Sequence, residues 1–118
     1  MFKANKDAFE AELGIRYKNI AVYDSMYYKN PKNKCWIIVA SNDPLPEINL
    51  SGIDEELVIE KICNEIEFNC IADPCIGKGL VAFYASKAGK AFVGTELNEK
   101  RLAVCVERVT TGERGRIN

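Results

Sequence analysis

Two glycines separated by one residue, Gly77 and Gly79, constrain the fold of this chain more than any other feature. They follow an apolar run at 68–72, which has the composition of a short buried strand. They precede a run at 80–88 with helical spacing, which Gly89 can end. Glycines between a strand and a helix allow a sharp turn and let the backbone approach a ligand with no Cβ in the way. The junction therefore predicts a ligand-binding loop.

A second strand and a second helix are predicted directly after this helix. The strand spans 91–95, Glu96 stands at its end, and Asn98 can cap the helix that follows. The buried stripe of that helix consists of Leu102, Cys105, Val106 and Val109. Strand–helix–strand–helix at this spacing predicts a right-handed βαβ unit with parallel strands. An acid at the second strand end can accept both ribose hydroxyl protons of an adenosine, so the pattern favours a nucleotide-type ligand.

The first half of the chain is expected to hold a helix and a β-hairpin. A weak helical pattern covers 1–13, with Gly14 as its stop. Two β-rich runs follow at 19–23 and 35–40, and the polar, Pro-containing segment 29–34 between them can serve as the turn. The second run is continuously apolar, as expected for a strand that is covered on both faces.

A loop with two prolines, at 41–52, leads to a helix at 54–66, for which Ser51 or Asp54 is the expected N-cap. The length fits one hydrophobic core at most, so 1–118 is expected to be a single, or partial, domain. Its two regions are the N-terminal helix and hairpin at 1–50 and the ligand-binding βαβ region at 51–109.

Charge, hydropathy and cysteine content exclude several classes. Sixteen Lys and Arg against 17 Asp and Glu give a net charge of −1, so any attraction to nucleic acid must come from a local patch. No apolar run approaches the ~20 residues of a membrane span, and the N-terminus lacks a signal-peptide pattern. Five cysteines without a C-x-x-C pair indicate reduced thiols in a cytoplasmic protein. The absence of histidine excludes His-dependent triads and most zinc sites, and no metal site is expected.

Segment 73–79 (DPCIGKG), together with 94–98 (GTELN), resembles the S-adenosylmethionine site of class I methyltransferases. It is most similar to the DNA methyltransferases that modify adenine N6 or cytosine N4. The helix at 54–66 resembles the helix that precedes this motif in the permuted members of that family. The resemblance implies an α/β fold, a small Rossmann-like methyltransferase core with three α/β/α layers and a partly parallel sheet of about five strands. It implies S-adenosylmethionine as cofactor. The implied cofactor-binding residues are Asp73, Pro74, Cys75, Gly77, Gly79, Glu96 and Asn98.

The same family carries a second motif, (Asp/Asn/Ser)-Pro-Pro-(aromatic), in which a side-chain oxygen and a proline carbonyl accept hydrogen bonds from the target amine. The best match is at 42–46, where Asp43 and Pro44 are the candidate catalytic residues. Leu45 replaces the second proline, and no aromatic residue follows. The alternative is a plain loop after a hairpin. The direction of the strand at 35–40 separates these hypotheses. Catalysis by Asp43 predicts that this strand runs parallel to and beside the strand at 68–72, whereas a plain loop predicts that it pairs antiparallel with the strand at 19–23.

The resemblance implies an S-adenosylmethionine-dependent methyltransferase acting on an exocyclic amine of DNA. Because the chain is short for a full methyltransferase, we expect a homo-oligomer or a complex with another polypeptide, and no membrane partner. The competing hypothesis is a degenerate, non-catalytic module that binds the cofactor or a partner. A nicotinamide-binding fragment and a Pro74-Cys75 nucleophile are weaker alternatives. A basic and aromatic cluster around the hairpin has two interpretations: a surface that contacts DNA through phosphate charge and base stacking, or a solvated hairpin with a half-buried face. Its residues are Arg16, Tyr17, Lys18, Tyr23, Tyr27, Tyr28, Lys29, Lys32, Lys34 and Trp36.

Overall fold

The computed structural model describes residues 3–26, 29–48, 53–75 and 77–115. The predictions for Tyr27, Tyr28 and Ser51 therefore lie outside the described residues. The chain divides into two compact units, Met1–Val58 and Ile59–Asn118, which are described in turn. None of the described helices combines the length and hydropathy that a membrane span requires.

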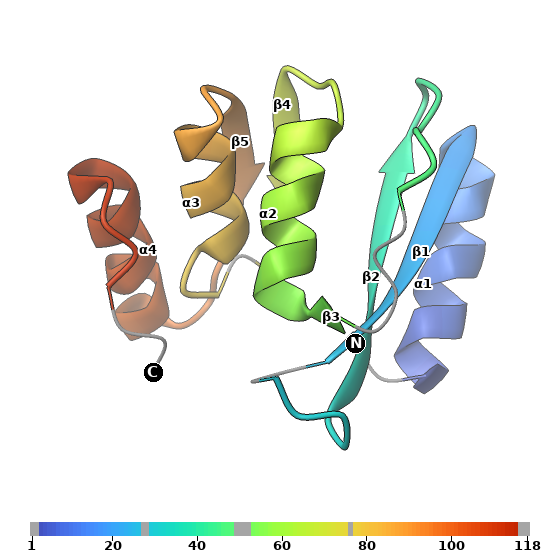
Figure 1. Cartoon of the computed structure of the whole chain (residues 1–118), viewed down its shortest axis with the longest axis horizontal. Coiled ribbons are helices and arrows are strands. Elements are labelled where there is room, and N and C mark those ends of the chain that lie inside the picture. The colour runs from blue at the N-terminus through green and yellow to red at the C-terminus, as the bar shows by residue number, and fades with distance from the viewer. Residues whose placement is uncertain (1–2, 27–28, 49–52, 76, 116–118) are drawn as a thin grey trace. The chain divides into compact units, whose positions relative to one another are not determined.

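The N-terminal unit is built on a β-hairpin, as the sequence predicted. Strand β1 (Asn19–Met26) pairs antiparallel with β2 (Lys34–Ser41) along its whole length, from Asn19 opposite Ser41 to Met26 opposite Lys34. The short strand β3 (Ile53–Asp54) pairs parallel with the end of β1, so the strand order is β2-β1-β3. Helix α1 (Lys3–Arg16) packs against β1 and β2 (Figure 1).

Two expectations for this unit were wrong. Helix α1 does not stop at Gly14 but runs on to Arg16, because Gly14 keeps a negative φ and an Arg16–Glu12 ion pair of 2.9 Å spans the last turn. Strand β2 is not buried along its length. Cys35 is 1% exposed, whereas residues 36–41 are half-buried, because β2 is the outermost strand of its sheet among the described residues.

Helix α2 (Glu55–Glu65) begins at a capping aspartate. Asp54 Oδ2 accepts a hydrogen bond from the backbone N–H of Glu56 at 3.3 Å, which agrees with its prediction as N-cap. The apolar face of the helix is buried, with Val58 and Cys63 at 0% and Ile62 at 4% exposure. Burial raises the pKa of the Cys63 thiol to about 11, so this side chain is a neutral packing group.

The C-terminal unit confirms the predicted strand–helix–strand–helix order. It contains β4 (Cys70–Asp73), α3 (Leu80–Lys87), β5 (Ala91–Gly94) and α4 (Glu99–Thr111). Strands β4 and β5 are parallel, from Cys70 opposite Ala91 to Asp73 opposite Gly94, and α3 packs on β5 and α4. The buried centre is Ala82 with Cys105, against which Phe92 and Val109 pack. All five cysteines are free thiols, of which Cys35, Cys63 and Cys105 are buried.

Lys90 binds the C-terminal end of helix α2. Its ammonium donates hydrogen bonds to the carbonyls of Cys63 and Ile66, at 2.9 and 2.6 Å, and lies 4.0 Å from the centre of the Phe68 ring. Cys63 is in the last turn of α2 and Ile66 directly follows the helix, where backbone acceptors have no partner within the helix. A cation there also interacts favourably with the helix dipole.

We predict that Lys90→Met lowers the free energy of unfolding by about 1–3 kcal/mol, because two buried carbonyls lose a charged donor. Denaturant unfolding followed by circular dichroism measures this loss. The matched control is Lys87→Met. The Lys87 ammonium is exposed and lies 5.5 Å from the Phe83 ring centre, so its removal should cost no more than about 1 kcal/mol. Equal losses in the two variants would show that Lys90 does not fix this helix end.

Candidate functional site

The carboxyl ends of β4 and β5 meet at one edge of their sheet, and the chain segments that follow are bonded to each other. The backbone N–H of Thr95 donates to the carbonyl of Asp73 at 3.3 Å, and its hydroxyl donates to the carbonyl of Pro74 at 2.5 Å. In a parallel sheet, this edge is where ligands bind. Both motifs that the sequence singled out begin here.

Glu96 holds the centre of this edge. Its Oε1 atom accepts the backbone N–H of Gly77 at 2.9 Å, and its Oε2 atom accepts the backbone N–H of Asn98 at 2.9 Å. The N–H groups of Asn98 and Gly77, together with the nearby Arg101 charge, keep the pKa of this carboxyl below its usual value. Each oxygen of an ionised carboxylate has a further lone pair, so the group can still accept hydrogen bonds from a ligand.

Asp73 shapes the first turn of the loop. Its Oδ1 atom accepts the backbone N–H of Cys75 at 3.0 Å, which closes a local turn of the kind that aspartate favours. Pro74 and Cys75 are consequently presented at the surface, and both are exposed. The Cys75 thiol and the Asp73 carboxylate therefore lie at the same strand end as Glu96.

The two glycines have different roles. Both have positive φ, +57° at Gly77 and +84° at Gly79. At Gly79, a Cβ would collide with the Cys105 side chain of α4, and it would lie only 3.0 Å from the Cys105 Cα. At Gly77, a Cβ would meet nothing within 4 Å. Gly79 thus permits close packing of the loop on α4, whereas Gly77 leaves open space beside the Glu96 carboxylate.

Asn98 begins α4 as the sequence predicted. Its side-chain Oδ1 accepts the backbone N–H of Arg101 at 3.1 Å, which is the hydrogen bond of an N-cap. Because its own N–H donates to Glu96, the start of α4 is fixed to the end of β5.

Arg108 is a site residue that the sequence analysis missed. It is only 4% exposed, and its Nη1 atom donates to the carbonyl of Lys78 at 3.1 Å, from beneath the glycine loop. Its spacing in the sequence could have identified it as a buried residue. Arg108 lies three residues after Cys105, on the apolar stripe of α4, where a charged residue requires a buried partner.

The catalytic candidates Asp43 and Pro44 lie in the N-terminal unit and are exposed. The backbone N–H of Asp43 donates to Ser41 Oγ at 3.0 Å, and its carbonyl accepts Asn19 Nδ2 at 3.0 Å. These bonds tie the loop after β2 to the first residue of β1. The strand that precedes Asp43 is thus the second strand of an antiparallel hairpin.

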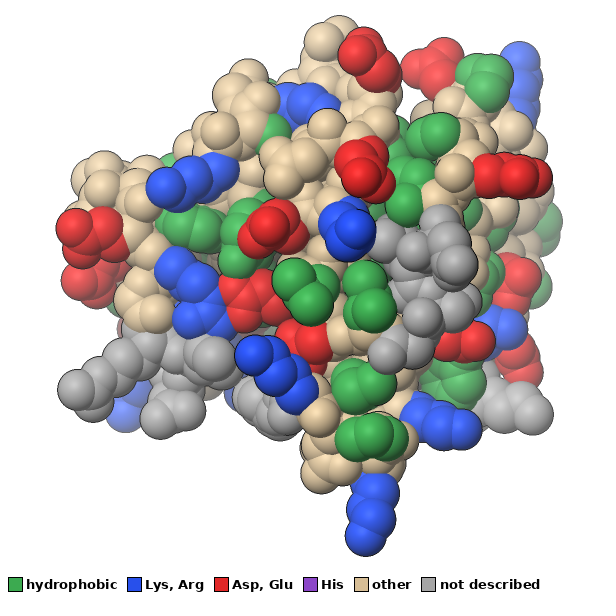
Figure 2. Space-filling view, viewed as in Figure 1, with side chains coloured by type: hydrophobic (Ala, Val, Ile, Leu, Met, Phe, Trp, Pro, Cys, Tyr) green, Lys and Arg blue, Asp and Glu red, His purple; other side chains and the backbone are tan. Residues whose placement is uncertain are grey.

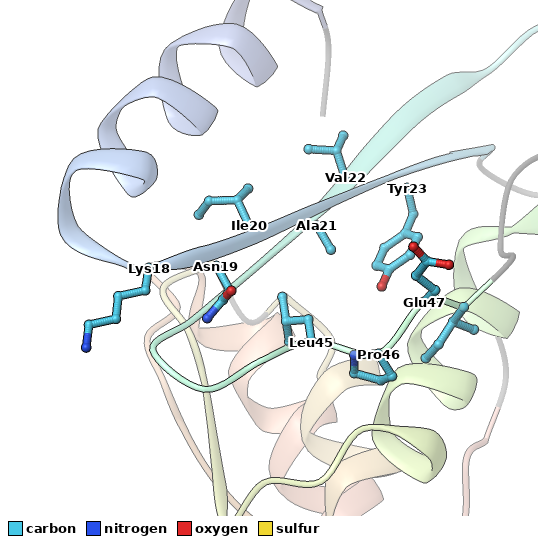
Figure 3. A pocket seen from close by; sticks show the side chains of 10 residues that line it. Lys18, Asn19, Ile20, Ala21, Val22, Tyr23, Leu45, Pro46 and Glu47 are labelled. Atoms are coloured by element: carbon cyan, nitrogen blue, oxygen red, sulfur yellow. The ribbon is translucent and has the colours of Figure 1, made fainter.

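An open hollow of about 800 Å³ lies beside this loop, lined by residues 18–23 and 45–48. Tyr23 points toward Leu45 and Pro46, whereas Ile20 and Val22 point to the other side of β1 (Figure 3). Burial raises the pKa of the Tyr23 hydroxyl, so it is neutral at physiological pH. In the described part of the chain, no group of three or more Cys, Asp or Glu side chains is placed to hold a metal ion.

Comparison with solved structures identifies the fold as the Rossmann-like α/β fold of methyltransferases. The DNA methyltransferase M1.HpyAVI matches 79% of this chain with a TM-score of 0.53 and 18% identity. Its complex with S-adenosylmethionine matches 75%, with a TM-score of 0.50 and 15% identity. TTHA0409 from Thermus thermophilus, a candidate DNA modification methylase complexed with S-adenosylmethionine, matches 83%, with a TM-score of 0.53 and 14% identity.

The chain spans a little over half of these structures: 59% and 58% of the two M1.HpyAVI chains and 54% of TTHA0409. No protein-family profile and no curated protein sequence matches it. The predicted α/β methyltransferase fold is therefore confirmed by structure rather than by sequence similarity. The expected sheet of about five strands is instead two sheets among the described residues, β2-β1-β3 and β4-β5, because no backbone ladder joins the hairpin to the parallel pair.

We predict that Gly79→Ala lowers the free energy of unfolding by about 2–4 kcal/mol, through collision with Cys105 and an unfavourable φ. Gly77→Ala is the matched control, because it has the same kind of φ and no collision, and its cost should be about 1–2 kcal/mol. Chemical denaturation of both variants measures the difference. A loss at Gly77 equal to that at Gly79 would contradict the assigned packing role.

Proposed function

We propose that this chain binds S-adenosylmethionine and belongs to a methyltransferase acting on an exocyclic amine of DNA, adenine N6 or cytosine N4. The observation that carries the proposal is the position of Glu96. Its ionised carboxylate stands at the end of β5, next to the glycine turn after β4. In a parallel α/β sheet this is the place of the acid that binds an adenosine ribose.

The residues at this edge fit the cofactor. The Glu96 oxygens keep lone pairs for the two ribose hydroxyls, and among the described residues other than its chain neighbours none lies within 4 Å of where a Gly77 Cβ would be. We assign Asp73, Pro74 and Cys75 to the methionine end, and Asn98 to the adenosine end through the start of α4. When bound, the cofactor supplies an activated methyl group. The solved complexes of M1.HpyAVI and TTHA0409 with S-adenosylmethionine support this choice of cofactor.

For catalysis we propose Asp43 and Pro44 as acceptors of hydrogen bonds from the target amine. An amine that donates its protons to a carboxylate and a carbonyl keeps its lone pair directed at the methyl carbon, so no strong base is needed. The Asp43 side chain is exposed, and its backbone bonds to Ser41 and Asn19 hold the loop in place.

One observation favours a second candidate function, a non-catalytic cofactor-binding or interaction module. Strand β2 is antiparallel to β1, and the loop carrying Asp43 is tied to Asn19 at the start of β1. This is the geometry expected of a plain loop after a hairpin. In that case Asp43 does not accept the amine protons, and the wild-type chain transfers no methyl group to DNA.

We propose that the two units act as one methyltransferase-like domain within an assembly, either a homo-oligomer or a complex with a second polypeptide. One observation supports this. Strand β2 is the outer strand of its sheet among the described residues and carries an apolar run at 35–40. An apolar outer strand favours pairing with a strand of another chain.

We predict that the chain binds S-adenosylhomocysteine and not NAD, and that Glu96→Ala weakens binding at least tenfold, because two ribose hydroxyls lose a charged acceptor. Isothermal calorimetry measures both affinities. Glu99→Ala is the matched control, since Glu99 is an exposed acid three residues further on and should change the affinity less than twofold. Unchanged affinity in Glu96→Ala would remove Glu96 from the site, and selective binding of NAD would contradict the proposal.

If Asp43 is the amine acceptor, Asp43→Ala abolishes transfer of a radiolabelled methyl group to duplex DNA. The affinity for S-adenosylhomocysteine should stay within twofold, the pattern of an interaction made only in the transition state. Asp24→Ala, an exposed acid on β1, should retain activity. Sedimentation of the same preparation reports the assembly state. Binding of the cofactor analogue with no transfer by the wild-type chain would favour the module.

A further inference from the structure

The turn of the β1–β2 hairpin carries several positive charges, although the net charge of the chain is −1. Residues 25–42 contain Lys29, Lys32 and Lys34 and no acidic residue. All three lysines are exposed, and none of them takes part in the ion pairs found among the described residues, which involve Lys6 and Arg16. Figure 2 shows basic side chains in the lower part of the view, where Figure 1 draws this turn.

Backbone hydrogen bonds fix the shape of the turn without using the lysine side chains. Asn30 accepts two of them, from the N–H of Asn33 to its carbonyl at 2.9 Å and from the N–H of Lys32 to its Oδ1 at 3.0 Å. Lys29 has a φ of +56°, and its backbone N–H donates to Asp54 Oδ1 at 2.6 Å. These bonds hold the backbone of residues 29–33 and leave the three ammonium groups available to an external anion.

The hairpin separates the basic and aromatic cluster of the sequence analysis into two parts. Tyr17 and Lys18 precede β1 and lie at its far end, since Asn19 pairs with Ser41 and Met26 pairs with Lys34. A strand of this length places them roughly 25 Å from the turn. Tyr23 is 7% exposed and cannot stack on a base. The three turn lysines, defined here as the hairpin tip, are thus a separate basic surface.

We propose that the hairpin tip binds the phosphate backbone of duplex DNA. This inference rests on the proposed function, in which DNA is the substrate, and it names the surface that holds the duplex. Lysines act as point charges, so they contact phosphates and position the duplex without reading its sequence. The hydrogen bonds within 29–33 reduce the backbone ordering that such contacts require, which favours binding.

Fluorescence anisotropy with a labelled duplex of about 24 base pairs tests this in the full chain, at salt concentrations from about 50 to 200 mM. We expect the triple variant Lys29→Gln, Lys32→Gln, Lys34→Gln to bind at least tenfold more weakly at the lowest salt concentration. The slope of log K against log salt should fall in magnitude by about 3, close to one per lost phosphate contact. The control is Lys61→Gln, Lys87→Gln, Lys100→Gln. It makes the same change in net charge at exposed helix positions and should change affinity less than threefold.

Three results would overturn the inference: a wild-type chain that does not bind the duplex at low salt, a control that loses as much affinity as the tip variant, or a tip variant that keeps its affinity and instead aggregates. Aggregation would mean that these lysines protect the edge of β2 from pairing with other chains. Calorimetry with S-adenosylhomocysteine on each variant separates the two proposals, because tip-dependent DNA binding without cofactor binding refutes only the proposed function.

Discussion

Two hydrogen bonds to the Glu96 carboxylate hold together the glycine turn and the start of α4 in the C-terminal unit. One oxygen holds the N–H of Gly77 in the turn after β4, and the other holds the N–H of Asn98 at the start of α4. A single charged group therefore fixes the loop that opens α3 and the residue that caps α4. Anions are stabilised near helix N-termini, so its position also suits the dipole of α4. Gly79 and Arg108 complete the arrangement, by allowing close contact with Cys105 and by holding the Lys78 carbonyl from below.

Much of this arrangement could be predicted from local sequence. The spacing of apolar residues indicated the order of β4, α3, β5 and α4, and Asn98 was recognisable as an N-cap. Both glycines were expected at a sharp turn, and both have positive φ. What made Gly79 necessary was a contact with Cys105, which is distant in the sequence and which no local pattern contains.

The predictions that failed depended on tertiary context. Gly14 can end a helix, but here the Glu12–Arg16 pair and packing against the hairpin carry the helix past it. The apolar run of β2 indicated a strand covered on both faces, whereas its position at the edge of the sheet leaves it half-buried. The role of Lys90 could not be predicted, because the carbonyls that it binds are 24 and 27 residues away in the sequence. The sequence left the direction of β2 open. Its antiparallel pairing with β1 favours a plain loop at Asp43 over a catalytic role.

The central claim is that the Glu96 carboxylate binds both backbone N–H groups, and NMR tests it most directly. The amide resonances of Gly77 and Asn98 can be followed in 15N-labelled protein as the pH is lowered from about 7 to about 3, through the ordinary range of a glutamate. The account predicts that both resonances shift together, with one apparent pKa below the usual value of a glutamate, and that Glu96→Gln removes the transition. A Gly77 amide that does not respond while Asn98 titrates would contradict the account, because the glycine turn would then not be held by Glu96.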